Sequence, residues 1–328
     1  MATTHTFDVV IVGAGPAGMC AALYTGRSML RTAVLERGIP GGELLNTEKL
    51  DDWIGEKSIL GWELANKFYE HAKEFGAEFV TANVTCVRRR HDGTFETVTD
   101  SGDTYHSPAV IVTAGGTPIK LGIPGELEFA GKGVSYCAIC DGAFFKKHTI
   151  VVVGGGDAAV EEADFLTRYA DKVYVVHRRD AFRASRILQE RLFANPKVEV
   201  IWNAVAEEVL GDENGLMTGL RIRDVVTDEV RTLDATGCFV FIGFRPNTGI
   251  IDGHFDHDEM GYVLTDTMMS TSIKGLFAAG DLRSQLTRQV TTAVGDATTA
   301  AIAVEKYLKA RAEGGHAVNA HGSGGYAV

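Results

Sequence analysis

The sequence predicts an α/β protein that contains two related nucleotide-binding units. One stretch, FDVVIVGAGPAGMCAALYTGR, begins at Phe7, and a second, HTIVVVGGGDAAVEEADFLTR, begins at His148. Each combines a short β-branched run, which is typical of a buried parallel strand, with a glycine-rich turn and a helical segment. The two stretches coincide at a constant offset of 141 residues, and the same shift pairs TAVLERG with VYVVHRR. This repeat predicts two Rossmann-like dinucleotide-binding domains.

The glycine turns have the spacing that a dinucleotide requires. The first reads G-x-G-x-x-G and the second G-x-G-x-x-A. The first glycine permits a tight turn, the second lets a pyrophosphate approach the backbone, and the third position lets the helix pack on the strand. The helix N-terminus then offers N–H groups to the phosphates. The candidate contacts are Gly13, Gly15, Pro16, Ala17 and Gly18 in the first unit and Gly154, Gly156, Asp157 and Ala159 in the second.

The residue at the end of the second strand differs between the units. The first unit has Glu36, whose carboxylate can accept hydrogen bonds from both hydroxyls of an adenosine ribose. At the same offset the second unit has a basic run that consists of His177, Arg178, Arg179 and Arg183. Guanidinium groups bind a 2′-phosphate bidentately, whereas a carboxylate repels it. We therefore expect FAD at the first site and NADPH at the second, the alternative being that HRRDAFR is a solvated charge run.

The remaining chain shows further strand and helix patterns. We expect helices over residues 61–79 and 293–310, and strands near 79–87, 95–99, 109–113, 198–201, 219–223 and 238–242. A further short apolar strand is expected within 271–281, before the Gly-Asp that ends this segment. The final segment, GGHAVNAHGSGGYAV, has no period and is expected to be a flexible tail. Its single aromatic residue is Tyr326.

Composition narrows the class of protein. The formal net charge is -11, which argues against a nucleic-acid partner because such binding depends mainly on clustered Lys and Arg. The opening MATTHTF has no basic segment followed by an apolar one, so we expect no secretory signal. No apolar run approaches the ~18 residues that suggest a spanning helix. We expect a cytoplasmic protein with no membrane partner, in a compartment where a CxxC pair is redox-active or binds metal.

The segment CAICD carries such a pair, Cys137 and Cys140. Two cysteines at this spacing can close a disulfide within one helical turn, and a helix N-terminus can lower a thiol pKa. Half of a zinc site is the alternative, but zinc needs two further ligands, and the other cysteines occur singly in apolar segments. We expect no metal: Cys20 and Cys238 are interpreted as small core residues, and Cys86 has no expected role. Asp141, directly after the second cysteine, is a candidate proton carrier or a helix-start carboxylate.

Several motifs in one order resemble a known family. GAGPAG, CAICDG, GGGDAAVEEA, HRRDAFRA, TSIKGLFAAGD and RQV are similar to those of low-molecular-weight, bacterial-type thioredoxin reductases, which are pyridine nucleotide-disulfide oxidoreductases. The resemblance covers residues 7–310 and implies an NADPH domain inserted into a discontinuous FAD domain. Carried onto this chain, it implies an FAD domain of 1–119 and 244–312 and an NADPH domain with the CxxC over 120–243. Residues 313–328 are the expected flexible tail. Some members of the family lay an aromatic residue of the tail over the flavin, so the resemblance offers this role to Tyr326 as the alternative to a flexible tail.

The resemblance also implies an activity. Electrons would pass from NADPH through FAD to the Cys137–Cys140 pair and then to thioredoxin or a thioredoxin-like protein, in a homodimeric enzyme. It places Cys140 against the flavin, gives Cys137 the attack on the partner, and makes Asp141 the acid/base. Open alternatives are a reductase for another small disulfide protein and a non-enzymatic redox-sensing module. Peroxiredoxin-serving relatives carry a long N-terminal extension, and ferredoxin-linked relatives lack the arginine cluster.

The same resemblance implies further contacts with FAD. It places Gly41, Gly42, Arg288, Gln289 and Val290 at the flavin, Asp281 at the ribityl chain, and the backbone of Val84 at the adenine. The chain departs from the family pattern at two of the expected FAD contacts: Glu43 stands where Gln is usual, and Asp52 where Asn is usual. Each exchange replaces an amide with a carboxylate, so the contacts and the flavin potential are expected to differ in detail.

Overall fold

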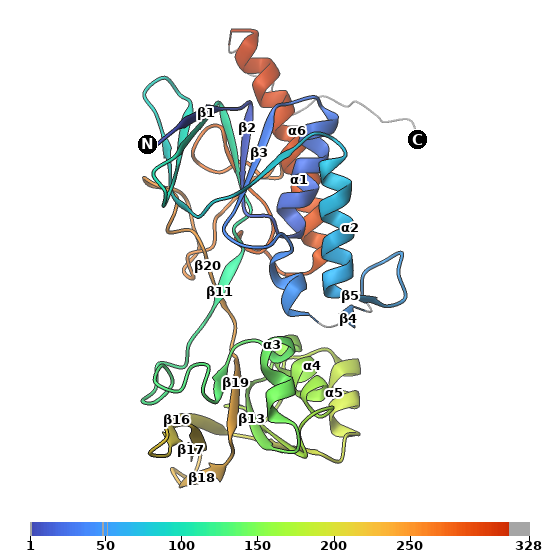
Figure 1. The fold of residues 1–328 in the computed structure, drawn as a ribbon, viewed down its shortest axis with the longest axis vertical. Coiled ribbons are helices and arrows are strands. Elements are labelled where there is room, and N and C mark those ends of the chain that lie inside the picture. The colour runs from blue at the N-terminus through green and yellow to red at the C-terminus, as the bar shows by residue number, and fades with distance from the viewer. Residues whose placement is uncertain (1, 48, 51, 315–328) are drawn as a thin grey trace. The chain divides into compact units, whose positions relative to one another are not determined.

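The chain divides into two compact units in a computed structural model that describes residues 2–47, 49–50 and 52–314. One unit consists of Met1–Gly116 together with Pro246–Val328, and the other is Thr117–Arg245 (Figure 1). The second unit is continuous in sequence and interrupts the first. The expected tail contact of Tyr326 lies outside the described residues.

A parallel sheet forms the centre of the discontinuous unit. Its strand order is β21-β10-β2-β3-β6. The strands are β2 (Val9–Val12), β3 (Thr32–Glu36), β6 (Glu78–Thr81), β10 (Ala109–Val112) and β21 (Leu276–Ala278). Val9 pairs with Thr32 and Ile11 with Val34, and all four residues of β2 are buried. This burial on both faces explains why the strand reads as an uninterrupted apolar run.

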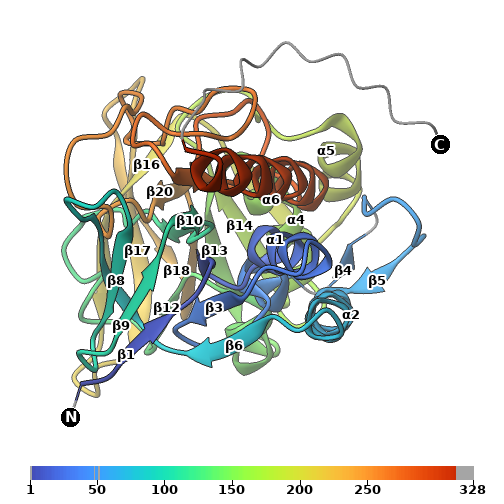
Figure 2. The same ribbon diagram turned by 90° about the horizontal axis from the view of Figure 1, so that it is seen from above.

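The two faces of this sheet are covered differently. Helices α1 (Pro16–Arg27), α2 (Gly61–Lys73) and α6 (Val290–Ala312) lie side by side on one face (Figures 1 and 2). Val9 and Ile11 pack toward these helices, whereas Val10 and Val12 pack toward a second sheet, as the twofold alternation of a strand requires. That sheet has the order β1-β9-β8-β7 and consists of β1 (Thr4–Thr6), β7 (Val84–Arg89), β8 (Phe95–Thr99) and β9 (Thr104–Ser107).

The inserted unit repeats this plan. Its parallel sheet has the order β12-β19-β13-β14-β15, formed by β12 (Val134–Ser135), β13 (Thr149–Gly154), β14 (Lys172–Val176), β15 (Val198–Ile201) and β19 (Gly237–Phe241). Helices α4 (Asp157–Leu166) and α5 (Arg186–Phe193) cover one face, and an antiparallel sheet of β16 (Ala204–Gly211), β17 (Met217–Asp224) and β18 (Val230–Asp234) covers the other. The predicted fold class, two Rossmann-like units with one inserted into the other, is thereby confirmed.

Short elements complete the chain. They are η1 (Gly42–Asn46), β4 (Lys49–Leu50), β5 (Ile59–Leu60), α3 (Ala138–Asp141) and η2 (Gly142–Phe145). The chain passes between the units along β11 (Gly116–Pro118) and β20 (Phe244–Pro246), which pair with each other. Beside this pairing the N–H of Ile119 donates to the carbonyl of Gly243 at 2.9 Å.

Two expected elements differ in extent. The helix expected over 61–79 ends at Lys73, and Gly76 after it has φ +82°, a left-handed conformation that stops a helix. The expected strand around 79–87 is two strands, β6 and β7, which belong to different sheets. The alternation of apolar residues continues across both strands, so the sequence pattern did not show the break between them.

Candidate nucleotide and disulfide sites

Of the three glycines of the first turn, only the middle one, Gly15, has open space beside it. A Cβ on Gly13 would lie 2.6 Å from the carbonyl of Thr113, and one on Gly18 would lie 1.9 Å from the carbonyl of Gly13. A Cβ on Gly15 would meet nothing closer than Gly42 Cα at 3.9 Å. Gly15 is also the N-cap of α1, and no side chain caps this end of the helix. The N–H groups of the first turn are therefore not blocked by a capping side chain. This arrangement suits a phosphate.

A cavity of about 280 Å³ lies beside this turn. It is lined by Val12, Gly13, Leu35, Glu36, Arg37, Ala82, Asn83, Val84, Ala114, Asn247, Gly249 and Ile250. Glu36 ends β3, and its two carboxylate oxygens accept hydrogen bonds from the N–H of Ala14 at 2.7 Å and of Gly38 at 2.9 Å. A carboxylate has about four acceptor positions, so two remain for ribose hydroxyls. The cavity therefore fits the adenosine part of a dinucleotide.

Several residues of this cavity were missed in the sequence. Asn247 follows β20 where the chain re-enters the unit, and its amide donates to the carbonyl of Ala114 at 2.8 Å. Asn83 and Arg37 directly adjoin two residues that were predicted, Val84 and Glu36. Their position next to predicted residues could have identified them, because residues that follow parallel strands lie together at one edge of the sheet.

The predicted residues Gly41 and Gly42 lie against the same turn. The N–H of Gly41 donates to the carbonyl of Ala14 at 2.8 Å, and a Cβ on Gly42 would lie 3.0 Å from Gly15 Cα. Gly42 has φ +56° and Gly41 φ +146°. A second glycine pair thus passes close to the backbone of the first glycine turn, and larger residues would clash there.

The carboxylate of predicted Asp281 lies within electrostatic range of two others, those of Glu43 and Asp296. The pKa of Asp281 is raised to about 6, chiefly by burial; the positive charge of Arg288 lowers it, and the negative charges of Glu43 and Asp296 contribute to the rise. Desolvation likewise raises the pKa of Glu43, opposed by its hydrogen bond from Asn46. Because Glu43 stands where the family usually has Gln, this chain has an additional carboxylate within electrostatic range of Asp281.

The start of α6 carries the other predicted flavin contacts. Gln289 is the N-cap, and its side chain and that of Thr292 form a reciprocal capping box before Val290 begins the helix. The Arg288 guanidinium lies 4.0 Å from the centroid of the Tyr262 ring. Predicted Asp52 is exposed in the segment before β5, and among the described residues no hydrogen bond or ion pair joins it to the start of α6.

The glycine turn of the inserted unit shows the same division. A Cβ on Gly154 would lie 2.3 Å from the carbonyl of Phe241 and 2.6 Å from the Cβ of Ala159, so the helix packs tightly on the strand. A Cβ on Gly156, the N-cap of α4, would meet nothing within 4 Å. Asp157, the first residue of α4, has a partner of its own: its carboxylate accepts a hydrogen bond from the N–H of Ser185 at 2.6 Å.

The basic run after β14 is tied to this turn. The N–H of Arg183 donates to the carbonyl of Gly155 at 2.8 Å. Arg178, Arg179 and Arg183 are exposed, and in the described part of the chain none of them pairs with a carboxylate. His177 is only 7% exposed, and its ring occupies the space that a Cβ on Gly155 would need. The structure thus offers the three arginines, rather than the histidine side chain, to an anion.

The two predicted redox cysteines form a disulfide, Cys137–Cys140. Cys137 is the N-cap of α3 and is half-buried, whereas Cys140 is exposed. The N–H of Cys140 donates to Sγ of Cys137 at 3.2 Å. Asp141, half-buried, ends the same helical turn, so its carboxylate belongs to the turn that carries the disulfide.

The other cysteines are not part of this site. Burial raises the pKa of Cys238 to about 12, with a smaller contribution from the charge of Glu126. Desolvation also raises the pKa of Cys20 and of Cys86. Thiols with raised pKa values are poor nucleophiles at neutral pH.

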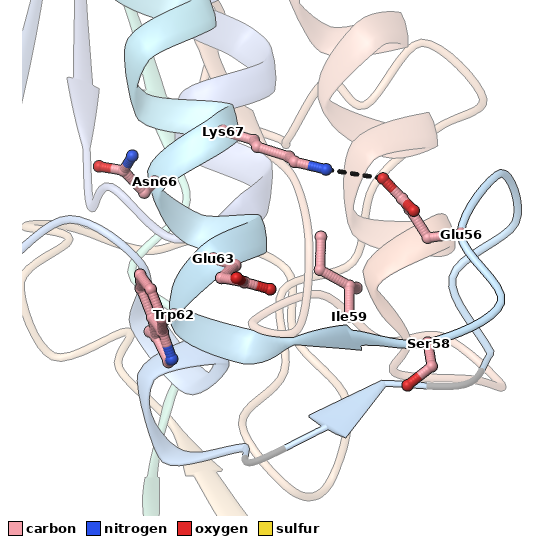
Figure 3. Close-up of a pocket in the computed structure, with 7 residues that line it drawn as sticks. All are labelled: Glu56, Ser58, Ile59, Trp62, Glu63, Asn66 and Lys67. Atoms are coloured by element: carbon pink, nitrogen blue, oxygen red, sulfur yellow. Dashed lines mark hydrogen bonds and ion pairs between the residues drawn. The ribbon is translucent and has the colours of Figure 1, made fainter.

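A separate hollow lies at the start of α2 (Figure 3). It has a volume of about 360 Å³, and Lys67 forms an ion pair with Glu56 at 2.6 Å on its rim. None of the residues predicted from the sequence lines it. Its ion pair is exposed, and such pairs contribute little to stability. Among the described residues, no helix is both long and apolar enough to cross a membrane.

Comparisons with known proteins agree with this geometry. A family model described as pyridine nucleotide-disulphide oxidoreductase matches residues 7–297. A thioredoxin reductase of Bacillus subtilis is 47% identical over 310 residues, covering 94% of this chain and 97% of the relative. The corresponding protein of Listeria monocytogenes is 46% identical, with 92% and 94% covered.

Solved structures show the same similarity. Thioredoxin reductase of Lactococcus lactis superposes with a TM-score of 0.90 at 42% identity, covering 92% of this chain and 99% of that one. The T. acidophilum thioredoxin reductase gives a TM-score of 0.88 at 34% identity, covering 93% and 99%. The chain therefore belongs to the pyridine nucleotide-disulphide oxidoreductase family and, within it, to the thioredoxin reductases, which confirms the resemblance. Membership implies a flavin and a pyridine nucleotide as cofactors.

Proposed function

We propose that this protein is a thioredoxin-disulfide reductase that takes electrons from NADPH, binds FAD, and reduces its partner through Cys137 and Cys140. The observation that carries this proposal is the pairing of two features on one inserted unit. That unit has a closed disulfide on α3 and a glycine turn with three exposed arginines beside it. The similar proteins are thioredoxin reductases, which points to thioredoxin as the partner.

The residues present fit FAD in the discontinuous unit. The open backbone at Gly15 suits a pyrophosphate, and Glu36 retains acceptor positions for a ribose. We assign Val84 to the adenine end, where it lines the cavity, and Asp281, Arg288, Gln289 and Val290 to the flavin end.

The residues of the inserted unit fit NADPH. Gly156 leaves the start of α4 open to phosphates, and Arg178, Arg179 and Arg183 are exposed and bear charge suited to a 2′-phosphate. The backbone bond from Arg183 to Gly155 fixes the arginine segment relative to the turn. A ferredoxin donor would have no use for this cluster.

When bound, FAD would accept a hydride from NADPH and supply two electrons for the disulfide. Two protons accompany these electrons, so Cys137 and Cys140 become thiols. We assign to Cys137 the attack on the partner's disulfide: its thiolate bonds to one partner sulfur, and the other leaves as a thiolate. Cys140 then attacks Sγ of Cys137, which releases the second partner sulfur and closes the protein's disulfide. Asp141 would carry protons to and from the leaving thiolates.

The proposal includes a homodimer, inferred from the resemblance, and a cytoplasmic location, inferred from the cysteine content of the chain. Gel filtration with light scattering measures the first. The remaining alternative for the partner is another small disulfide protein, which would meet the same dithiol by the same exchange.

The test is an anaerobic assay of the FAD-loaded protein with NADPH and oxidised bacterial thioredoxin. We expect one NADPH to be consumed for each thioredoxin disulfide reduced. Cys137→Ser and Cys140→Ser should abolish this consumption while NADPH still bleaches the flavin spectrum. Bleaching without thioredoxin reduction by the unmodified protein would favour a different disulfide partner. A flavin spectrum that NADPH does not change would favour the sensing module.

A further inference from the structure

The inserted unit contains a buried carboxylate that the proposed chemistry does not use. Glu126 is 1% exposed, and each of its carboxylate oxygens accepts at least one hydrogen bond. One accepts from the N–H of Leu121 at 2.8 Å and from the hydroxyl of Tyr136 at 2.8 Å. The other accepts from the N–H of Gly122 at 2.7 Å. A carboxylate is costly to bury unless it is satisfied in this way, so these three bonds are strong structural restraints.

The donors to Glu126 come from two functionally different segments. Leu121 and Gly122 follow β11, the strand by which the chain enters the inserted unit. Tyr136 lies between β12 and the disulfide, directly before Cys137. A single side chain therefore connects the entrance of the unit with the residue that precedes the redox cysteine.

The backbone around Cys137 is fixed from its other neighbour as well. Ser135 is 5% exposed, and its hydroxyl accepts from the N–H of Cys137 at 3.1 Å and donates to the carbonyl of Cys137 at 3.2 Å. Burial, and after it the hydrogen bond to Glu126, raises the pKa of Tyr136, so its hydroxyl retains its proton. The hydroxyl is thus a permanent donor at physiological pH.

We propose that Glu126 and Tyr136 are positioning residues for the redox disulfide: their hydrogen bond holds the Cys137 backbone where it closes the bond to Cys140. Reduction breaks the Sγ–Sγ bond and adds two electrons and two protons, and oxidation requires both thiols to meet again. A restrained Cys137 keeps the thiols close and favours the disulfide form. The proposal rests on the proposed redox role of the pair, but its test does not involve thioredoxin.

The experiment is a redox titration of the FAD-loaded protein with mixtures of reduced and oxidised dithiothreitol. Dithiothreitol gives up two electrons and two protons and closes its own disulfide as Cys137–Cys140 opens. Alkylation and trypsin then report the thiols on the peptide 133–146, which contains these two cysteines and no other. Tyr136→Phe removes one oxygen atom and leaves the ring. Tyr174→Phe, at another half-buried tyrosine of the same unit, is the control.

We expect Tyr136→Phe to make the disulfide easier to reduce, changing the equilibrium constant at least about threefold, because a charge-assisted hydrogen bond is lost. Glu126→Gln should act in the same direction, and the double variant should exceed the larger single effect only slightly, since both remove one interaction. Tyr174→Phe should leave the constant unchanged. The thermal midpoint of Tyr136→Phe, measured alongside, separates positioning from a general loss of structure.

An unchanged equilibrium constant in Tyr136→Phe would overturn the proposal, as would an equal change in Tyr174→Phe. If Glu126→Gln does not fold, Tyr136→Phe still decides the question. Failure here with intact thioredoxin reduction would leave the proposed function standing. Failure of thioredoxin reduction with a shifted constant would do the reverse.

Discussion

Four basic side chains follow β14, and burial divides them into two kinds. His177 is packed beneath the glycine turn, where its Nε2 lies 3.1 Å from the carbonyl of Ala181. Desolvation lowers its pKa, so it is neutral at pH 7 and lends no charge to a ligand. The arginines are exposed and always charged. We infer that the histidine shapes the turn while the arginines meet the 2′-phosphate.

Replacement of Arg178 and Arg179 by Gln should raise the Michaelis constant for NADPH and leave that for NADH nearly unchanged. The two nucleotides differ only by the 2′-phosphate. Hydrogen bonds to charged groups contribute roughly 1.5–3 kcal/mol each, and exposure favours the low end. Because ~1.4 kcal/mol is tenfold, two such contacts predict a preference for NADPH of at least about a hundredfold in the unmodified enzyme.

Steady-state kinetics with both nucleotides measure this preference. The control is Arg231→Gln, at an exposed arginine on β18 of the same unit. Added salt should weaken the preference, since it screens exposed charges. Equal catalytic efficiency with NADH and NADPH in the unmodified enzyme would show that the cluster is a solvated surface.

At the scale of the element, each glycine of the second turn has a different task. Gly154 has φ +156° and is enclosed by Phe241 and Ala159, whereas Gly156 has φ −94° and open space beside it. Gly156→Ala should therefore fold normally but weaken NADPH binding, because the new methyl group occupies the path of the pyrophosphate. Gly154→Ala should destabilise the inserted unit through a direct clash with backbone.

Calorimetry and NADPH titration of the two variants make the comparison. We expect Gly156→Ala to keep its thermal midpoint and lose about tenfold or more in affinity, in the range of one well-formed phosphate interaction. The control is Gly295→Ala on the exposed face of α6 in the other unit, where a new Cβ also has open space beside it. Unchanged NADPH affinity in Gly156→Ala would contradict the assignment of this turn to the pyrophosphate.

The sequence predicted the elements whose pattern is local. The glycine turns, the disulfide spacing and strands such as β15 were recognised because strand, turn and helix follow one another directly. The sheet formed by β16, β17 and β18 was largely missed, since its half-exposed strands lack a continuous apolar run. Glu126 was missed for a related reason: in GELEFAGKG it looks like a surface acid, and only the distant Tyr136 hydroxyl and two backbone donors explain its burial.

At the scale of the whole molecule, each described apolar cluster belongs to one unit. The helices α1 and α6 and both sheets of the discontinuous unit enclose their own cores. The cores of the inserted unit form around β13 and its neighbours, with Val151 on one face and Val152 on the other. Multi-domain proteins with separate cores commonly depart from two-state unfolding.

We therefore expect two thermal transitions, each sensitive to a different ligand. Adenosine 2′,5′-bisphosphate carries the 2′-phosphate and should raise only the transition of the inserted unit, by roughly 2.7 kcal/mol of unfolding free energy at a hundred times its dissociation constant. Removal of FAD should lower only the other transition. Calorimetry measures both, and flavin fluorescence identifies the transition of the discontinuous unit. There are two controls. Adenosine 5′-phosphate, which lacks the 2′-phosphate, should give little of this shift with the unmodified protein, and the bisphosphate should give little of it with the Arg178/Arg179 double variant. One transition that moves equally with both ligands would mean that the two cores unfold together, and that the separation of clusters has no thermodynamic counterpart.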